Sequence, residues 1–465
     1  MRVVMVTMLG LWLTGCGGGN SGTPDGAPAD GSVDVDAAAD GDAGEVDGAA
    51  VDGALEVDAA MMGDAALAGD AALGLDAAMA DAQPADAQPA DAQPADAQPA
   101  DAAGCGALAA DPTDVYVDRS ATTTSVGTQA CPFHSIREAT LLTAPAGSRI
   151  IHVRGGTPAF VYSETGPIAV RAREHLQGDG ETLTQVTGVA RCSVFDCVVT
   201  LAATARLSGF TVTGAAVEIP TGADGAAVDH VTVTGSNNDG FYVRATAQLS
   251  NVTARANQRH GLDARTGTVT ITDSHFDGND DDGVHADRQV VIDFRRGSAS
   301  NNTLLGIALQ DSATVSSSRM HTLTDVVIER NLGFGIEVGS TASLRLRNTV
   351  MRQNEVGLVF TPSSATGNLL DLGTATAGGA GGNVFAGNVA GSRNLRSGLC
   401  IQQSGAAGSQ VAEGDTWSVC PPSQRRITGP FCVSQNTYAD VGYVQASGVT
   451  DAPPLAAPAS CTVGP

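Results

Sequence analysis

Residues 251–286 read NVTARANQRHGLDARTGTVTITDSHFDGNDDDGVHA, and this stretch decides the fold. It contains the same unit twice. Each unit is an asparagine, three variable residues, a glycine, and then an apolar residue, a variable residue and an alanine. The two asparagines are Asn257 and Asn279, and the two glycines are Gly261 and Gly283. A unit repeated at this spacing indicates a chain built from similar turns.

The same pattern recurs from about residue 207 to residue 361, with glycines spaced by 21, 22, 23, 29 and 22 residues. A period near 22 that holds two or three short β-rich segments leaves no room for a helix, which excludes leucine-rich and helical repeats. Propeller blades of four longer strands need about twice this length. The repeated glycines are Gly240, Gly261, Gly283, Gly306, Gly335 and Gly357, and the asparagines are Asn257, Asn279, Asn302, Asn331 and Asn354.

The remaining solution is a solenoid in which each turn of chain lies on the previous one and pairs parallel strands about 4.8 Å apart. Alternating Val, Ile, Leu and Phe side chains then point inward and form a continuous core. An asparagine amide inside each turn can hydrogen-bond to its neighbours above and below, which satisfies backbone groups that the bend leaves open. The sequence therefore predicts an all-β parallel solenoid rather than an irregular β-sandwich.

With its flanks, this repeat resembles the right-handed parallel β-helix of the pectin-lyase-like fold over most of residues 112–420. The segments DVYVD (114–118) and PFHSIREA (132–139) resemble the N-terminal part of exported members of that fold. Ser135 and Glu138 form a capping box, which predicts a short helix covering the open N-terminal end of the solenoid. The resemblance implies a fold shared by lyases, hydrolases, epimerases, binding proteins and adhesins, so it does not choose a function.

Composition divides the rest of the chain. Residues 1–15 hold Arg2, an apolar run and small residues before Cys16, and they resemble a bacterial lipoprotein signal peptide whose cysteine is acylated. Residues 16–103 are rich in Asp, Ala and Pro with almost no aromatic residue, and are predicted to form a disordered tether. The expected folded regions are an N-terminal cap with the first coils (104–206), the main coils (207–399) and a cysteine-rich C-terminal cap (400–465).

Charge is distributed unevenly along the chain. The formal net charge is −25, there is no Lys, and residues 17–103 hold 19 of the 50 acidic residues. Neither this segment nor the rest offers a basic face, so no nucleic-acid partner is expected. Gly17 stands where an inner-membrane retention signal places Asp. We therefore expect an outer-membrane lipoprotein, periplasmic or surface-exposed, that meets the membrane only through Cys16 and has an envelope or extracellular polysaccharide as partner.

Eight cysteines remain besides Cys16, and an even number in an exported chain indicates disulfides. Metal binding by cysteine is less expected because no CxxC pair occurs. Cys192 and Cys197 are close enough in sequence for a local bridge, whereas the pairing of the others stays open. The disulfide candidates are Cys105, Cys131, Cys192, Cys197, Cys400, Cys420, Cys432 and Cys461.

Alignment of the coils on their glycines places polar residues in columns, concentrated in three consecutive coils. If each strand alternates, the columns two and four residues after the glycine face solvent on one sheet. The position two after glycine reads Tyr242, Asp263, His285, Ala308, Glu337 and Val359. The position four after glycine reads Arg244, Arg265, Asp287, Gln310, Gly339 and Thr361, and the position before it reads Asp239, His260, Asp282, Leu305, Phe334 and Val356.

These columns hold the residue types that chemistry on an acidic sugar requires. Positive charge must neutralise the sugar carboxylate, a base must remove the C5 proton, and an acid must protonate the leaving oxygen. The candidate catalytic residues are His285, Tyr242, Arg265 and Asp263. The candidate substrate-binding residues are Arg244, Asp239, His260 and Asp287. The run Asp280, Asp281 and Asp282 offers hard oxygen ligands for Ca²⁺, and no other cofactor is expected.

Short motifs in this region resemble those of glycan-active enzymes, but only in part. NNDG (237–240) resembles the Asn-x-Asp-Gly element of polygalacturonases and RHG (259–261) their Gly-His-Gly element, but the aspartate pair follows the histidine motif and the Arg-x-Lys element is missing. GLDAR (261–265) resembles the Gly-Phe-Asp-Pro-His-Glu stretch of mannuronan epimerases without its Pro and His. A copper-delivery β-helix is a third relative, and no His or Met cluster at ligand spacing accompanies that likeness.

Incomplete motifs and the absence of Lys favour a lipid-anchored module that binds carbohydrate or has a recognition or structural role at the cell surface. The alternative is a polysaccharide lyase or C5-epimerase that acts on acidic glycans through residues 237–287. A third interpretation is an ordinary solvated face, because Asp, Asn and Arg are common partners on neighbouring coils.

Substitution of Cys16 tests the predicted anchor. Acyl chains on Cys16 bury many methylene groups at about 0.8 kcal/mol each, so the full chain made in a Gram-negative host should partition into the detergent phase of Triton X-114. Cys16→Ser should move it to the aqueous phase, whereas the control Thr14→Ser should not. Equal partition of the wild-type chain and Cys16→Ser would contradict the anchor.

Overall fold

A computed structural model of the chain describes residues 105–464, with gaps at 123–124, 189, 193–195, 311–318, 340–341, 362–368, 374–378, 386, 389–396, 404–411, 413–414, 418, 421, 427–438 and 446–460. Cys16, the predicted tether and Cys432 lie outside the described residues. Within those residues, no helix is long and apolar enough to cross a membrane.

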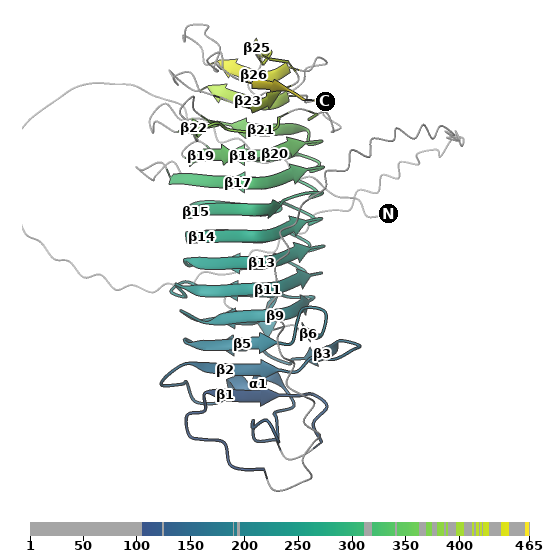
Figure 1. Cartoon of the computed structure of the whole chain (residues 1–465), viewed down its shortest axis with the longest axis vertical. Helices are drawn as coiled ribbons and strands as arrows, with labels where there is room; N and C mark the ends of the chain where they lie inside the picture. The colour runs from purple at the N-terminus through teal and green to yellow at the C-terminus, as the bar shows by residue number, and fades with distance from the viewer. Residues whose placement is uncertain are drawn as a thin grey trace, which may run out of the picture. The chain divides into compact units, whose positions relative to one another are not determined.

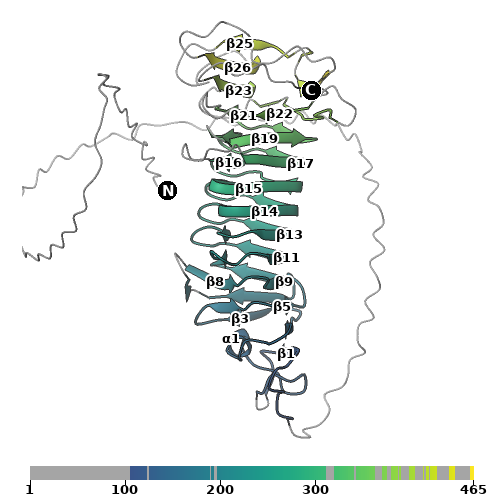
Figure 2. The ribbon, with the colours of Figure 1, turned by 90° about the vertical axis from the view of Figure 1, so that its left-hand side faces the viewer.

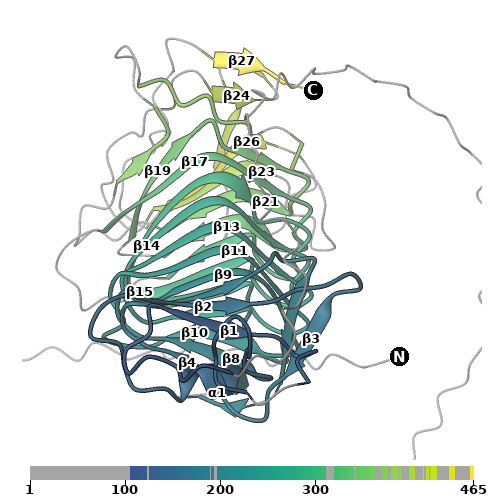
Figure 3. The same cartoon turned by 60° about the horizontal axis from the view of Figure 1, so that its bottom comes forward.

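Strands of successive coils pair in parallel and lie one on another (Figure 1). The pairings form three ladders, which we call I, II and III in the order in which a coil passes through them. The tilted view of Figure 3 shows the coils as stacked layers. Because crossovers between parallel strands are right-handed in nearly all proteins, this arrangement is the right-handed parallel β-helix that the repeat predicted.

Most strands belong to one ladder. Ladder I contains β1 (Asp114–Val117), β2 (Arg149–Val153), β5 (Glu174–Gly178), β19 (Ala342–Arg347) and β22 (Leu370–Asp371). Ladder II contains β3 (Phe160–Ser163), β6 (Thr184–Thr187) and β20 (Val350–Arg352). Ladder III contains β4 (Ile168–Val170), β8 (Asp196–Leu201), β10 (Ala216–Ile219), β12 (Phe241–Val243), β16 (Ile307–Leu309), β18 (Phe334–Val338), β21 (Val356–Phe360), β23 (Ser397–Gln403), β25 (Gln424–Arg426) and β26 (Ala439–Gln445).

Longer strands connect the ladders. Strands β9 (Arg206–Thr213), β11 (Ala226–Thr234), β13 (Ala247–Arg255) and β17 (Arg319–Glu329) run from ladder I into ladder II. Strands β14 (Leu262–Asp277) and β15 (Val284–Ser298) begin in ladder III and continue through the other two. Strand β7 (Ala190–Arg191) forms an antiparallel hairpin with β8, and β24 (Asp415–Trp417) pairs with β27 (Cys461–Val463).

From β9 onward, a single residue makes the corner between ladders I and II, and its backbone adopts the left-handed region. In β9 this residue is Gly209 (φ 74°), but in the six following coils it is not glycine and its φ lies between 49° and 56°. Asn and Asp tolerate this conformation better than other side chains, but His and Arg also occur here. The corner residues are His230, Asn251, Asp273, Arg296, Asp325 and Asn348. Sequence reasoning found no signal for this corner because a non-glycine residue does not mark it.

The predicted asparagine stack forms the turn between ladders II and III. Each buried amide donates to the side-chain oxygen of the asparagine on the next coil, as from Asn257 to Asn279 (2.9 Å) and from Asn279 to Asn302 (3.1 Å). The same oxygen accepts a backbone N–H, and the amide also donates to a strand carbonyl, such as Phe276 O from Asn302. The stack continues through Asn331 and Asn354 to Asn388, which the sequence repeat did not include.

The pairing of an asparagine with a glycine in each repeated unit has a steric cause. A Cβ atom on Gly261 would lie 2.8 Å from Asn279 Nδ2 and 2.7 Å from the carbonyl oxygen of Gly283. Gly240 and Gly283 meet the same pair of groups on their next coils. Only glycine leaves room for the asparagine amide of the following coil.

The N-terminal end of the solenoid is closed as expected. The short helix α1 (Ile136–Thr140) has the predicted capping box, buries Ile136 and Ala139, and packs against β1 and β4 (Figure 2). Disulfides join Cys105 to Cys131, Cys192 to Cys197 and Cys420 to Cys461, and Cys400 is also disulfide-bonded. Inward side chains between the caps form one apolar core from Val115 to Tyr443.

Asn302 and its neighbour Asn301 provide a matched test of the asparagine stack. Asn302 is fully buried and Asn301 is exposed. Asn302→Asp removes the donor to Phe276 O and Asn331 Oδ1 and buries a charge, so it should lower the free energy of unfolding by at least about 3 kcal/mol. Asn301→Asp keeps a residue that tolerates positive φ and should change it by less than about 1 kcal/mol. Chemical denaturation measures both, and equal losses would contradict the role of the stack.

Candidate functional site

Polar residues of three successive coils lie on the outer side of ladder III. In β12, β14 and β15 the register pairs Tyr242 with Asp263 and Asp263 with His285, so the aligned column is confirmed. The residues on either side of each, such as Leu262 and Ala264, belong to the apolar core. Strand alternation therefore directs the column away from the core.

The expectation that this column faces solvent is wrong. Asp263 is 0 % exposed and Tyr242 is 8 % exposed, although both point outward. Arginine side chains from the next column fold back over them. Arg265 donates to Asp263 (2.7 Å) and Asp287 (2.5 Å), and Arg244 lies over the Tyr242 ring with its Cζ 5.3 Å from the centroid.

Two columns from these coils form what we call the polar grid. It consists of the following six residues, one pair for each coil: Asp239 and Tyr242, His260 and Asp263, Asp282 and His285. Each glycine-preceding member is also buried, because it begins the strand just after the asparagine turn. The repeat thus brings together side chains up to 46 positions apart in the chain.

Two histidines meet in the grid, although their separation in sequence gives no ligand motif. His260 and His285 stack with their ring centroids 4.5 Å apart. Asp282 lies between them: its Oδ2 is 2.9 Å from His285 Nδ1 and 3.5 Å from His260 Nδ1. The sequence expectation of no histidine cluster at ligand spacing is therefore corrected by coil stacking, which joins residues from neighbouring coils.

The predicted arginine clamp is already engaged by the protein's own carboxylates. Arg244 pairs with Glu218 of the preceding coil (2.8 Å), and Arg265 bridges Asp263 and Asp287. Arg259, which the sequence did not single out, donates to Asn238 and lies 3.6 Å from Asp239 Oδ2. These contacts fix the guanidinium groups as a layer above the buried acids.

Burial changes the acidity of the grid residues. Burial and the nearby Asp263 carboxylate raise the pKa of Asp239 to about 7, and burial raises the pKa of Asp263 against the effect of Arg265. Burial and the neighbouring His285 lower the pKa of His260 to about 2. Burial also acts to lower the pKa of His285, but the hydrogen bond to Asp282 outweighs it and the pKa is raised.

The three aspartates proposed for Ca²⁺ do not converge. Asp280 is exposed, Asp281 lies 3.6 Å from His260 Nε2, and Asp282 is buried between the histidines. Burial and the charge of Asp282 raise the pKa of Asp281 to about 6. The groups that do converge, with ligand atoms within 4.8 Å of one another, combine His260 either with Asp282 and His285 or with Asp239 and Asp263.

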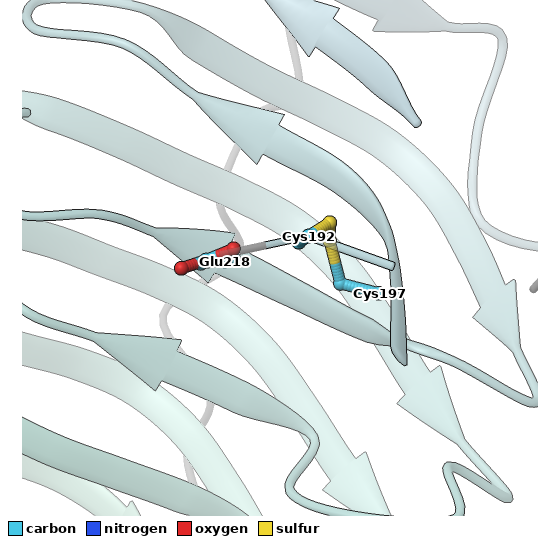
Figure 4. A group of neighbouring side chains, drawn as sticks. All are labelled: Cys192, Cys197 and Glu218. Atoms are coloured by element: carbon cyan, nitrogen blue, oxygen red, sulfur yellow. A yellow bond between two sulfur atoms is a disulfide. The ribbon is translucent and has the colours of Figure 1, made fainter. Parts of the chain in front are cut away.

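A third group consists of Cys192, Cys197 and Glu218 (Figure 4). The two cysteines form a disulfide across the β7–β8 hairpin, so their sulfur atoms are not thiolate ligands. Glu218 instead serves as the partner of Arg244 and continues the column of Tyr242 by one coil.

Beyond the grid, the same face becomes apolar. Ala308 follows His285 in the column, and Phe334, Val356, Val359 and Cys400 form a small separate cluster outside the main core. Leu304 and Leu332, on the turns beside this cluster, are 47 % and 67 % exposed. In the three coils that follow the grid, the column of His285 continues with Ala308, Glu337 and Val359, and the pKa of Glu337 is raised by burial and by Asp282.

The family described as "Protein of unknown function (DUF1565)" matches residues 120–424. No curated protein matches the chain.

Three solved structures illustrate the similarity. The A-module of mannuronan C-5 epimerase AlgE4 from Azotobacter vinelandii is 15 % identical, with a TM-score of 0.44 over 75 % of this chain and 100 % of that one. The periplasmic alginate epimerase AlgG is 13 % identical, with a TM-score of 0.37 over 68 % and 77 %. Pectate lyase Pel9A is 14 % identical, with a TM-score of 0.35 over 73 % and 78 %. Similarity at this level leaves the function to be inferred from the chain's own side chains.

Proposed function

The chain belongs to the DUF1565 family, whose description assigns no activity, and we propose that it is a cell-envelope protein that binds an acidic polysaccharide over the polar grid and transfers a proton at the bound sugar. The reaction class is that of a polysaccharide lyase or C5-epimerase. The observation that carries this proposal is the pair of Asp282 and His285 on the outer side of ladder III.

The contact between Asp282 and His285 prepares an imidazole for proton transfer. Asp282 Oδ2 accepts the Nδ1 proton of His285, which leaves the Nε2 lone pair available to a substrate. Asp282 is itself held in place, because its Oδ1 accepts the backbone N–H of Leu305. A surface that only recognises a ligand has no need for a buried carboxylate that orients an imidazole.

In elimination, His285 Nε2 takes the C5 proton, the C4–O4 bond breaks and a C4–C5 double bond forms. The same imidazolium then returns the proton to the leaving O4. In epimerisation, the C4–O4 bond stays intact and C5 instead receives a proton from a water molecule on its opposite face. Tyr242 lies two coils from His285, about 10 Å along the column at the usual strand spacing, so we assign it to sugar binding rather than to the same proton.

The accessible atoms of the site favour an anionic ligand. Side chains of Arg244, Arg259 and Arg265 are 23–44 % exposed, and those of Asp281 and Asp287 about as much (26 % and 25 %), whereas the acids beneath them are 0–5 % exposed, namely Glu218, Asp239, Asp263 and Asp282. A polysaccharide therefore meets guanidinium groups first, and their planar donors match a sugar carboxylate.

Recognition without turnover is the second candidate function. It is favoured by the internal pairing of the same arginines, which gives a rigid surface rather than mobile catalytic groups. For either function we propose that lipidated Cys16 anchors the chain in the outer membrane and that the acidic tether holds the β-helix away from it.

Incubation of the purified protein with alginate and pectin distinguishes the two functions. A lyase should raise the absorbance near 235 nm as the double bond forms, and an epimerase should exchange the C5 hydrogen for deuterium in D₂O. His285→Ala should lower either rate by about 100-fold or more, because a positioned acid–base group contributes about 10²–10⁴-fold. His275→Ala is the control. His275 lies exposed in the ladder II part of β14, away from the polar grid, so this variant should keep the wild-type rate.

Circular dichroism of each variant verifies folding. Polysaccharide binding with neither an absorbance rise nor deuterium exchange would reject catalysis and support recognition. Absence of both binding and turnover on all glycans tested would reject the proposed function.

A further inference from the structure

Two fully buried carboxylates of the polar grid each keep one oxygen without a hydrogen bond. Asp239 Oδ1 accepts the backbone N–H of His260 (3.3 Å), and Asp263 Oδ2 accepts from Arg265. Asp239 Oδ2 and Asp263 Oδ1 have no hydrogen-bond partner among the described residues. Both residues are 0 % exposed, and an unsatisfied buried polar group costs about 1–3 kcal/mol, more when it is charged.

These carboxylates and the imidazole of His260 converge on one point. One oxygen of each carboxylate and one ring nitrogen of His260 all lie within 4.8 Å of one another. The carboxylates come from neighbouring coils, and their charges repel each other. A cation held by these three groups would compensate the two buried carboxylates and remove that repulsion.

We propose that Asp239, His260 and Asp263 bind one divalent transition-metal ion of the Zn²⁺ class. Imidazole nitrogen with carboxylate oxygens is a ligand set that suits Zn²⁺ and its neighbours. Ca²⁺ is disfavoured because it takes six to eight oxygen ligands, whereas one of the three groups here is an imidazole nitrogen. Three protein ligands leave one position of a tetrahedral ion for water or a substrate.

Asp282 supports His260 as a ligand. Its Oδ2 lies 3.5 Å from His260 Nδ1, so it can accept the Nδ1 proton while Nε2 faces the ion. An acceptor behind a metal-bound imidazole sets the ring's orientation and raises its basicity. The backbone N–H of Asp282 lies 3.3 Å from the same nitrogen and donates to it in the other tautomer, so metal binding through Nε2 requires the Nδ1 proton to point at Asp282 Oδ2 instead.

Arg259 is the group that a metal ion must displace. Its guanidinium lies 3.6 Å from Asp239 Oδ2 and 3.3 Å from His260 Nε2, and its side chain is 44 % exposed. Its guanidinium also donates to the Asn238 side chain (3.1 Å). Removal of this competing positive charge should therefore strengthen metal binding, an effect that a structural role of the grid would not produce.

Metal binding is independent of the proposed glycan chemistry and is measured with the metal alone. The purified protein, stripped with a chelator, is titrated with ZnCl₂ by calorimetry, and bound metal is counted by mass spectrometry after dialysis. One equivalent is expected. Asp263→Asn and His260→Gln should each weaken Zn²⁺ binding by more than about 100-fold. Loss of a residue that only hydrogen-bonds to a metal ligand typically weakens binding by about 10–100-fold, so the larger loss identifies a ligand.

Two further variants complete the experiment. Arg259→Gln should tighten Zn²⁺ binding by about 10-fold, which corresponds to about 1.4 kcal/mol of binding free energy. Because this variant keeps all three proposed ligands, it still tests the proposal if a ligand variant fails to fold. His275→Gln, outside the grid, should bind as the wild type does. The stripped protein should also show a higher melting temperature when Zn²⁺ is added.

Three results would overturn the proposal. The first is no stoichiometric binding of Zn²⁺ or Co²⁺, which would mean that Asp239 and Asp263 share a proton instead. The second is Zn²⁺ binding that Asp263→Asn and His260→Gln leave unchanged. The third is tighter binding of Ca²⁺ than of Zn²⁺.

Discussion

One hydrogen bond, repeated from coil to coil between buried asparagine amides, is the constraint on which the rest of the structure depends. In a parallel β-helix a strand that slips by one residue would turn its core side chains outward. Each asparagine from Asn257 to Asn354 donates to the side-chain oxygen of the next asparagine, and its own oxygen accepts a backbone N–H of the preceding coil, so the turn closes in one register. Glycine four residues after most of these asparagines leaves room for the next amide, which couples the two positions of the repeated unit.

The register fixed at the asparagine turn decides which side chains of successive coils lie side by side on the outer face of ladder III. The residue before the glycine and the residue two after it always lie in two columns, whatever side chains they carry. In the three coils after Gly306 these columns hold mainly apolar residues such as Ala308, Val356 and Val359, which pack without electrostatic cost. In three coils they carry Asp, His and Tyr instead, and burial there shifts the pKa values of Asp239 and His260 in opposite directions from their usual ranges. Concentration of such groups in one section of an otherwise ordinary face is typical of a functional site.

Sequence reasoning predicted what short-range patterns specify. The repeat, the asparagine stack, the capping box at Ser135 and the bridge of Cys192 with Cys197 are all confirmed. It could not predict the corners at residues such as His230 and Arg296, because their left-handed backbone is imposed by the neighbouring coils and not by a local residue preference. It missed the contact of His260 with His285 because coil stacking joins positions 25 apart. It also took the grid for an exposed surface, since the arginines that cover Asp263 and Tyr242 are seen only in three dimensions.

Disulfide trapping on ladder I tests the register most directly. Gln248 and Thr270 are outward-facing partners on neighbouring coils, at the Cα separation of about 5 Å that a disulfide accepts. The account predicts that Gln248→Cys with Thr270→Cys forms a cross-link under mild oxidation, detected by peptide mass mapping. Gln248→Cys with Thr272→Cys, displaced by two residues to about 8 Å, should not. Cross-linking of the displaced pair in place of the aligned pair would contradict the register and, with it, the grouping of Asp239, His260 and Asp263.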